Sequence, residues 1–201
     1  MYTLIGSPFT RAFRVLWAME ELGLQYELQP VPPQSDEIRA INPSGKVPAL
    51  LVDGESIIDS VAIIQYLADK HGALTHKAGS LERAKQDSFT HFICDELDGT
   101  CWVMAKHSFV MPKELRQKEA VRPGAQWDME RALKALGSRL GDGPYLTGDT
   151  FTVSDLLLVH CSNWMTNCGF EIPEGKISAV IATAKERPAY KRSIEIREAL
   201  Q

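Results

Sequence analysis

The stretch LIGSPFTRAFRVLWAMEELG, residues 4–23, decides how the first part of the chain folds. Its first apolar run stops at Ser7, and apolar side chains then recur at spacings of three and four residues. This period is typical of an amphipathic helix, which we expect to begin near Arg11 and to end at Gly23. Two hydroxyl residues, Ser7 and Thr10, therefore lie where a strand passes into a helix. They either cap the helix or place a hydroxyl group beside an anion bound at its N-terminus.

Strand and helix patterns alternate through residues 1–75. The apolar runs on either side of Asp53-Gly54 predict two strands joined by a hairpin, because this dipeptide favours a tight turn. Asp59-Ser60 then precedes an apolar periodic run and predicts the start of a helix. The expected order, β-α-β-α-β-β-α, fits a mixed four-stranded sheet with three helices. The strands are expected at residues 2–6, 25–31, 49–52 and 56–58.

From about residue 81 onward the chain carries helical patterns and no convincing strand. Thr152, followed by Asp155, forms a capping box before the apolar run LLLVHCSNWM and predicts a further helix start. The sequence therefore predicts an α/β domain over residues 1–75 and an all-helical domain over residues 81–201. Other helices are expected at residues 82–106, 112–140, 177–186 and 189–200.

Composition and charge exclude several classes of function. The chain has 201 residues and a net charge of −4, with acidic and basic residues interleaved. Because there is no basic stripe, we expect no nucleic-acid partner. The longest apolar runs are too short to span a bilayer, so we expect no membrane partner. The first residues do not combine a basic region with an apolar stretch, as a secretory signal does, so we expect a cytoplasmic protein.

The four cysteines, Cys94, Cys101, Cys161 and Cys168, form two pairs with a spacing of seven residues. This spacing places the two members of each pair on one face of a helix. It matches neither a CxxC motif nor a zinc-site pattern, so we expect no metal. Cysteine is among the most often buried residues, and we interpret the four as core side chains.

Four motifs resemble, in the same order along the chain, those of the cytosolic glutathione transferases. The first is similar to that of bacterial members with a Ser-type or Thr-type N-terminal motif, including theta-like and phi-like ones. The resemblance extends over nearly the whole chain and implies a thioredoxin-like N-terminal domain followed by an all-α C-terminal domain. The motifs are SPFTRAFRVLWAMEELGLQYEL (residues 7–28), INPSGKVPAL (41–50), IIDSVAIIQYLADKHG (57–72) and YLTGDTFTVSDLLL (145–158).

The resemblance implies a glutathione site built largely from the second and third of these motifs. The family's proline at the position of Pro48 is normally cis, which turns the backbone of Val47 outward to pair with the cysteinyl part of glutathione. Asp59 and Ser60 would bind the γ-glutamyl ammonium and carboxylate, and Lys46 the glycyl carboxylate. From the residues alone, ordinary helix capping explains Asp59-Ser60 better than a ligand site does, and Asp59 stands where the family usually has a glutamate.

The resemblance also implies a hydroxyl group that stabilises the thiolate of bound glutathione. A hydrogen bond to the charged form of a thiol lowers its pKa, and each pKa unit is worth about 1.4 kcal/mol. Counting back from Arg11 in the theta-like pattern selects Ser7, whereas another bacterial pattern selects Thr10. Both are candidate catalytic residues, and we expect Ser7, at the end of the strand, to lie closer to the sulfur.

The implied activity is the transfer of glutathione to small hydrophobic electrophiles, as in detoxification, by a protein of a family that usually forms homodimers. Two alternatives stay open: a glutathione-dependent disulfide reductase or peroxidase, and a non-catalytic binding or assembly module. No cysteine lies in the first 93 residues, which argues against a mixed disulfide on the α/β domain. The helical domain offers five candidates for an electrophile pocket: Trp102, Met104, His107, Phe109 and Trp164.

Overall fold

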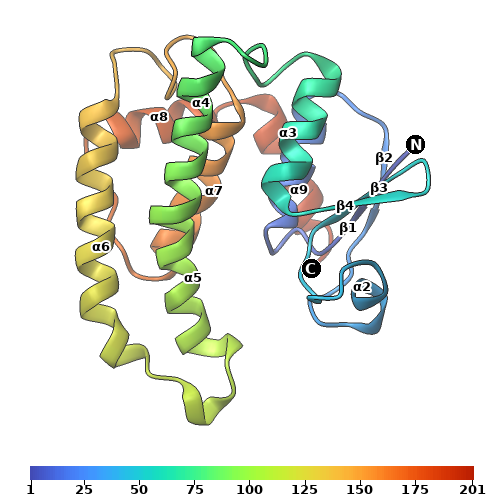
Figure 1. The fold of residues 1–201 in the computed structure, drawn as a ribbon, viewed down its shortest axis with the longest axis horizontal. Coiled ribbons are helices and arrows are strands. Elements are labelled where there is room, and N and C mark those ends of the chain that lie inside the picture. Colours follow the sequence, from blue (N-terminus) through green and yellow to red (C-terminus); the bar gives the residue numbers. More distant parts are fainter. The chain divides into compact units, whose positions relative to one another are not determined.

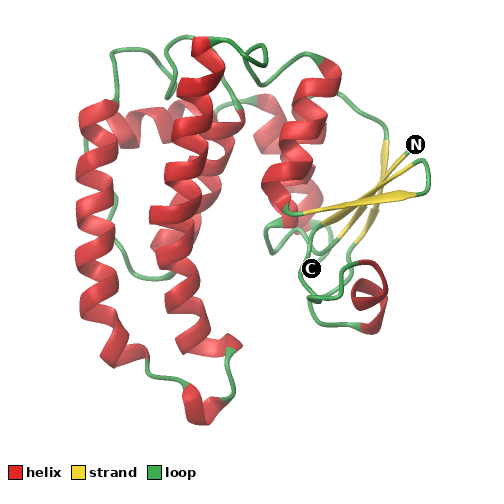
Figure 2. Ribbon diagram, in the orientation of Figure 1, coloured by secondary structure: helices red, strands yellow, loops and turns green.

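Two compact units make up the computed structural model, which describes the whole chain. The first unit combines Met1–Ala78 with Lys185–Gln201, and the second is Gly79–Ala184. Figures 1 and 2 show the sheet of the first unit and the helices of the second. This division differs at the C-terminus from the expected domains, 1–75 and 81–201, because the last helix packs within the first unit.

The sheet of the first unit consists of four short strands, β1 (Tyr2–Ile5), β2 (Tyr26–Gln29), β3 (Ala49–Val52) and β4 (Glu55–Ile58). Their order across the sheet is β2-β1-β3-β4. β1 runs parallel to β2 and antiparallel to β3, and β3 and β4 form an antiparallel hairpin. Asp53 and Gly54, at the turn of the hairpin, both have positive φ. The predicted mixed four-stranded sheet is therefore confirmed.

Four helices belong to the first unit: α1 (Ala12–Glu21), α2 (Asp36–Ile41), α3 (Ser60–His71) and α9 (Pro188–Glu198). α1 packs against both α3 and α9, and its residues from Val15 to Met19 are fully buried. Gly23 follows this helix with a φ of 62°, as the sequence predicted for its end. Figure 1 shows α3 and α9 on the same side of the sheet.

Aromatic contacts and ion pairs hold α9 against α1. The ring centroids of Trp17 and Tyr190 lie 4.8 Å apart in an edge-to-face arrangement. Arg187 donates to both carboxylate oxygens of Glu21 at 2.7 Å, and the Glu21 side chain is only 6 % exposed. Such bidentate pairs combine charge with fixed geometry. The local pattern of α9 indicates a helix but not the core on which it packs, so sequence analysis assigned it to the helical domain.

The second unit is helical, as predicted. Its elements are α4 (Leu81–Phe92), η1 (Ile93–Asp98), α5 (Gly99–Ala105), η2 (Lys106–Val110), η3 (Lys113–Leu115), α6 (Lys118–Arg139), α7 (Val153–Asn167) and α8 (Lys176–Lys185). η1 is π-helical and interrupts the helix predicted at residues 82–106 with a wider turn, and η2, also π-helical, extends beyond its predicted end. None of the helices has both the length and the apolar character that a membrane span requires.

The loop before α6 differs from the sequence prediction. Periodicity predicts a helix from residue 112, whereas α6 begins at Lys118. Pro112 has extended backbone, with φ −48° and ψ 139°. Arg116 donates to the carbonyl oxygens of Met111 and Phe109 at 2.7 and 2.9 Å. These bonds satisfy carbonyl groups at the end of η2 and stabilise a loop where apolar spacing alone indicated a helix.

A buried carboxylate organises the start of α7. Asp155 accepts hydrogen bonds from the N–H groups of Leu146 at 2.7 Å and Thr152 at 2.9 Å, and the Thr152 hydroxyl donates to it at 3.0 Å. The predicted capping box is therefore present, and it also ties the preceding loop to the helix. Burial raises the pKa of Asp155 to about 6, although these hydrogen bonds act in the opposite direction.

We predict that Asp155 contributes stability that is lost as pH rises through about 6. The carboxyl pKa is higher in the folded chain than in the unfolded one, so protonation favours folding below the unfolded pKa of about 4. The Asp155→Asn variant is expected to lack this part of the pH dependence. Urea unfolding of parent and variant between about pH 4 and pH 8 measures it. Parallel pH profiles of the two proteins would contradict the prediction.

Three segments of the first unit meet at Gly6, between β1 and the first turn before α1. Gly6 has a φ of 138°, which residues with a side chain rarely adopt. A methyl group added at its Cα would lie 2.9 Å from the Cβ of Val47 and 3.1 Å from the Cβ of Ala12. The end of the strand, the segment before β3 and helix α1 approach so closely because this residue has no side chain.

Gly6→Ala is expected to lower the free energy of unfolding by about 1–3 kcal/mol, because the methyl group overpacks this contact and the backbone is strained. Gly124→Ala is the matched control, since no atom lies within 4 Å of the Cβ added at Gly124 in α6. Alanine in a helix is favoured over glycine by about 1 kcal/mol, so the control should be neutral or stabilising. Chemical denaturation measures both variants. A Gly6→Ala protein as stable as the parent would contradict the prediction.

Candidate active site

Two hydroxyl groups lie at the turn between β1 and α1, and their hydrogen bonds differ. The Thr10 hydroxyl donates to the carbonyl oxygen of Ser7 at 2.6 Å and accepts from the N–H of Ala12 at 3.2 Å. The Ser7 hydroxyl accepts a long hydrogen bond of 3.4 Å from the N–H of Phe9 and donates to no group of the protein. The proton of Ser7 is therefore available to a ligand, whereas the proton of Thr10 is committed to the turn.

The segment before β3 presents backbone groups that the sheet does not use. The Val47–Pro48 peptide bond is cis. β3 pairs with its neighbours from Ala49 onward, and the N–H and C=O of Val47 make no hydrogen bond within the protein. The side chain of Asn42 donates to the carbonyl oxygen of exposed Lys46 at 2.8 Å and supports the segment. An extended peptide can pair with the free backbone of Val47 as an added strand.

Asp59 precedes α3 in a backbone conformation that is uncommon outside glycine. Its φ is 74° and its ψ is 121°. The Oδ1 atom of its carboxylate accepts from the N–H groups of Val61 at 2.9 Å and Ala62 at 3.1 Å. Its Oδ2 atom accepts from no group of the protein, and the residue is exposed. The helix cap offsets the backbone strain and leaves one carboxylate oxygen for a ligand.

A buried cation that sequence analysis missed lies against Ser60. Arg14, in α1, is 1 % exposed, and its Nη1 donates to the Oγ of Ser60 at 3.2 Å. Ser60 is the first residue of α3 and is also buried. The helix N-terminus and the guanidinium together favour an anion at Ser60. The one sequence signal for Arg14 is a charged residue in the apolar run AFRVLW.

The five candidates for an electrophile pocket lie in different surroundings of the second unit. The ring centroids of Trp102 and Trp164 are 6.4 Å apart, and both residues are half-buried. Phe109 is 64 % exposed. Met104 was expected to line the electrophile pocket, but its side chain is only 1 % exposed. Its position on the helix directs it into the core. The structure therefore brings the two tryptophans together and separates Met104 from any accessible surface.

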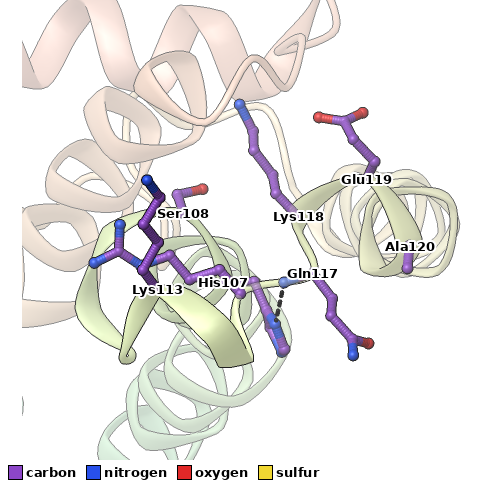
Figure 3. Close-up of a pocket in the computed structure, with 8 residues that line it drawn as sticks. His107, Ser108, Lys113, Gln117, Lys118, Glu119 and Ala120 are labelled. Carbon is purple, nitrogen blue, oxygen red and sulfur yellow. Dashed lines mark hydrogen bonds between the residues drawn. The ribbon is translucent and has the colours of Figure 1, made fainter.

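The fifth candidate, His107, lines a surface pocket between η2 and the start of α6 (Figure 3). The pocket has a volume of about 560 Å³, and three cationic residues, Lys113, Arg116 and Lys118, also line it. The Nδ1 atom of His107 accepts from the N–H of Gln117 at 3.2 Å, the dashed line in Figure 3. His107 therefore has a structural partner at the start of α6, and its Nε2 carries the proton when the ring is neutral.

The four cysteines are free thiols of the second unit. Cys101 and Cys161 are fully buried, whereas Cys94 and Cys168 are half-buried. A hydrogen bond between the thiols of Cys101 and Cys168, together with burial, raises the pKa of Cys101. The same hydrogen bond, followed by the charge of Arg122, lowers the pKa of Cys168. Cys168 is therefore the member of this pair that ionises first.

Two family profiles match the chain. The profile described as "Glutathione S-transferase, N-terminal domain" matches residues 1–76, and "Glutathione S-transferase, C-terminal domain" matches residues 100–188. The chain belongs to the glutathione S-transferase family. The N-terminal match contains the turn at Ser7, the cis peptide bond and the start of α3. The resemblance inferred from the four sequence motifs is thereby confirmed.

Individual relatives agree with this assignment. The Glutathione S-transferase GstA of Escherichia coli O157:H7 is 29 % identical over 170 residues, which are 82 % of this chain and 77 % of that protein. A maleylacetoacetate isomerase of Pseudomonas aeruginosa is 32 % identical over 173 residues, which are 79 % of this chain and 77 % of that protein. A theta class glutathione S-transferase from Xanthomonas axonopodis pv. citri, solved with glutathione bound, is 26 % identical, with a TM-score of 0.81 over 96 % of each chain.

The first unit of this glutathione S-transferase family member links the candidate site residues through the core. Gly6 joins the turn at Ser7 to the segment of Val47, and Arg14 joins α1 to Ser60. Three chain segments that are distant in sequence therefore present a free hydroxyl, free backbone groups and a helix N-terminus from one packed unit.

Asp59→Ala is expected to lower the free energy of unfolding by about 1–2 kcal/mol, because it removes the acceptor for two N–H groups and keeps a positive φ. Asp59→Asn is the matched control, since asparagine retains a capping oxygen and tolerates positive φ, and should change stability by less than about 0.5 kcal/mol. Urea denaturation compares the two. An equal loss in both variants would mean that the charge of Asp59, rather than its capping oxygen, stabilises α3.

Proposed function

We propose that this chain is a glutathione transferase that conjugates the thiolate of glutathione to small hydrophobic electrophiles. The observation that carries the proposal is the Ser7 hydroxyl, whose proton has no acceptor in the protein. It lies where β1 passes into α1, so a sulfur bound at this turn meets a hydroxyl donor near the positive end of a helix. The glutathione bound in the Xanthomonas relative supports the choice of ligand.

Hydrogen bonding supports different roles for the two hydroxyl groups. Thr10 uses its proton on the carbonyl oxygen of Ser7 and its oxygen on the N–H of Ala12, so it stabilises the turn. Ser7 accepts a single long hydrogen bond and keeps its proton for a ligand. We therefore assign the thiolate donor to Ser7 and the stabilisation of the turn to Thr10.

The energy of one such hydrogen bond is sufficient for thiol activation. A hydrogen bond to a charged group contributes about 1.5–3 kcal/mol, which corresponds to a shift of about 1–2 pKa units. Because a free cysteine thiol has a pKa of about 8.5, this shift brings the thiol pKa close to neutral and makes a large fraction of the bound thiol ionised at neutral pH. The thiol proton leaves to solvent on binding. Further acceleration comes from holding the thiolate against the electrophile, and no proton-relay triad is required.

Glutathione would bind to groups that the first unit presents around the turn at Ser7. Its cysteinyl part pairs with the N–H and C=O of Val47, beside Pro48, as an added strand. Its γ-glutamyl carboxylate accepts from the start of α3 at Ser60, against which the guanidinium of Arg14 lies. The γ-glutamyl ammonium donates to the Oδ2 atom of Asp59. The glycyl carboxylate pairs with the exposed ammonium of Lys46.

The electrophile in this proposal is a small hydrophobic molecule. Trp102 and Trp164 would supply an apolar wall, because paired aromatic side chains offer large contact surfaces. A homodimer, implied by the family resemblance, and a cytoplasmic location, expected from the sequence, belong to the same proposal. A glutathione-dependent reductase or peroxidase and a non-catalytic module of the same fold are the alternatives that the following experiment separates.

Calorimetric titration with glutathione at neutral pH, in buffers of different ionisation enthalpy, tests the proposal. The dependence of the heat on the buffer gives the number of protons released per glutathione bound. A substantial fraction of one proton is expected, because the bound thiol ionises. Binding without proton release would contradict thiolate activation and favour a redox or carrier role. An absence of binding would overturn the proposal and favour an assembly module.

Ser7→Ala and Thr10→Ala separate the two hydroxyl groups. Ser7→Ala is expected to raise the pKa of the bound thiol by about 1–2 units and to lower kcat/KM with an aryl halide about 10- to 100-fold. Thr10→Ala is expected to lower stability by about 1 kcal/mol and to keep the proton release. Calorimetry and steady-state rates measure both variants. If Thr10→Ala abolishes the proton release and Ser7→Ala does not, the thiolate donor is Thr10.

A further inference from the structure

We propose that Asp98, His160 and Cys161 of the second unit form a binding site for a thiophilic divalent metal ion of the zinc class. One carboxylate oxygen, one imidazole nitrogen and one thiol sulfur from these residues all lie within 4.8 Å of one another. This site is independent of the glutathione chemistry proposed above, since all three residues belong to the helical unit.

Two packed segments supply the three groups. Asp98 is the last residue of the π-helical segment η1, and His160 and Cys161 are neighbours in α7, which packs against η1. A π-helical turn widens the helix locally and is frequently found at functional sites. Because both segments belong to the packed unit, the three groups are held by the fold rather than by a loop.

The separation between Cys161 and Asp98 fits two ligands of a tetrahedral site. The Sγ atom of Cys161 lies 3.7 Å from the Oδ1 atom of Asp98 and donates a hydrogen bond to it. Zinc bonds of about 2.0–2.3 Å to oxygen, nitrogen and sulfur imply separations of about 3.3–3.8 Å between ligand atoms. The sulfur and the oxygen already have this separation, and the wider contacts require movements of about 1 Å.

Burial and donor chemistry favour zinc over harder cations. Cys161 is fully buried, whereas Asp98 and His160 are half-buried and leave a route for an ion. Thiolate and imidazole ligands select zinc and related transition metals rather than magnesium or calcium. Three protein ligands leave a fourth position for water. Metal binding would replace the thiol proton of Cys161, which is released to solvent.

The spacing of the cysteines in the sequence gave no sign of this site. Metal motifs are recognised by pairs of ligands at short spacing, whereas Cys161 pairs with Asp98 from another helix. The partner of Cys101, one turn beyond Asp98, is instead the thiol of Cys168. Of the four cysteines, only Cys161 therefore lies in a cluster with both an imidazole and a carboxylate.

Titration of the full-length protein with Co²⁺, after removal of bound metal by a chelator and in a thiol-free reductant, tests the proposal. Co²⁺ is a spectroscopic substitute for Zn²⁺ and gives a sulfur-to-metal charge-transfer band when a thiolate binds it. One equivalent is expected to bind with this band and to be displaced by Zn²⁺. No saturable binding, or binding without the band, would overturn the proposal.

Ligand variants with matched controls locate the ion. Cys161→Ser is expected to abolish the band. Asp98→Asn and His160→Gln are expected to weaken Co²⁺ binding at least about tenfold, because loss of a residue that only supports a ligand already lowers metal affinity by about this factor. Cys94→Ser and His107→Gln, of the same residue types outside the cluster, are expected to bind as the parent does.

Folding of each variant is checked by circular dichroism, and the half-buried Asp98 and His160 provide the test if Cys161→Ser does not fold. Retention of the band in Cys161→Ser, or parent-like affinity in both Asp98→Asn and His160→Gln, would overturn the assignment. So would loss of the band in Cys94→Ser, because Cys94 then supplies the thiolate.

Discussion

The close approach of three backbone segments at Gly6 is the constraint on which the candidate active site depends. A methyl group at this position would lie 2.9 Å from Val47, so the end of β1 and the segment before β3 cannot separate or shift without breaking a packed contact. Ser7 is the next residue of the chain, and the unpaired backbone of Val47 is on the other side of that contact. A hydrogen-bond donor and an unpaired backbone edge are therefore positioned by core packing, which holds a site more firmly than a loop does.

The helix N-terminus at α3 depends on the same core through one buried charge. Arg14 lies among apolar side chains of α1 and reaches Ser60 at the start of α3. A buried guanidinium is tolerated only with partners, and an anion at Ser60 would add a counter-charge beside it. Asp59 has a strained backbone, caps α3 with its own carboxylate and is exposed to solvent, whereas Ser60 next to it is buried. The strained backbone of Asp59 and the buried charge of Arg14 thus lie at the helix end where a carboxylate of the proposed ligand would bind.

Local periodicity predicts most of the secondary structure, because each helix or strand shows its buried face in its own residues. The sheet, α1, α3 and the capping box at Thr152 follow from such patterns. Contacts between distant segments do not follow from local patterns. For example, α9 packs on α1 through the ion pair of Arg187 and Glu21, which no local pattern connects. The contact of Arg14 with Ser60 was missed for the same reason. Met104 was misplaced because its residue type suits a pocket, whereas its position on the helix faces the core.

The two units differ in their sulfur chemistry, because all four cysteines lie in the second unit. The first unit has no cysteine, so glutathione bound as proposed at Ser7 would meet no protein thiol there with which to form a mixed disulfide. In the second unit the partners of each thiol differ: Cys168 shares a hydrogen bond with another thiol, whereas Cys161 faces a carboxylate. The equal spacing of the two cysteine pairs along the sequence therefore does not indicate that their thiols have different partners. The proposed contact of the Ser7 hydroxyl with a ligand thiolate and the contact of Asp98 with the Cys161 thiol have the same physical basis. In both, the groups around the sulfur atom determine its charge and reactivity.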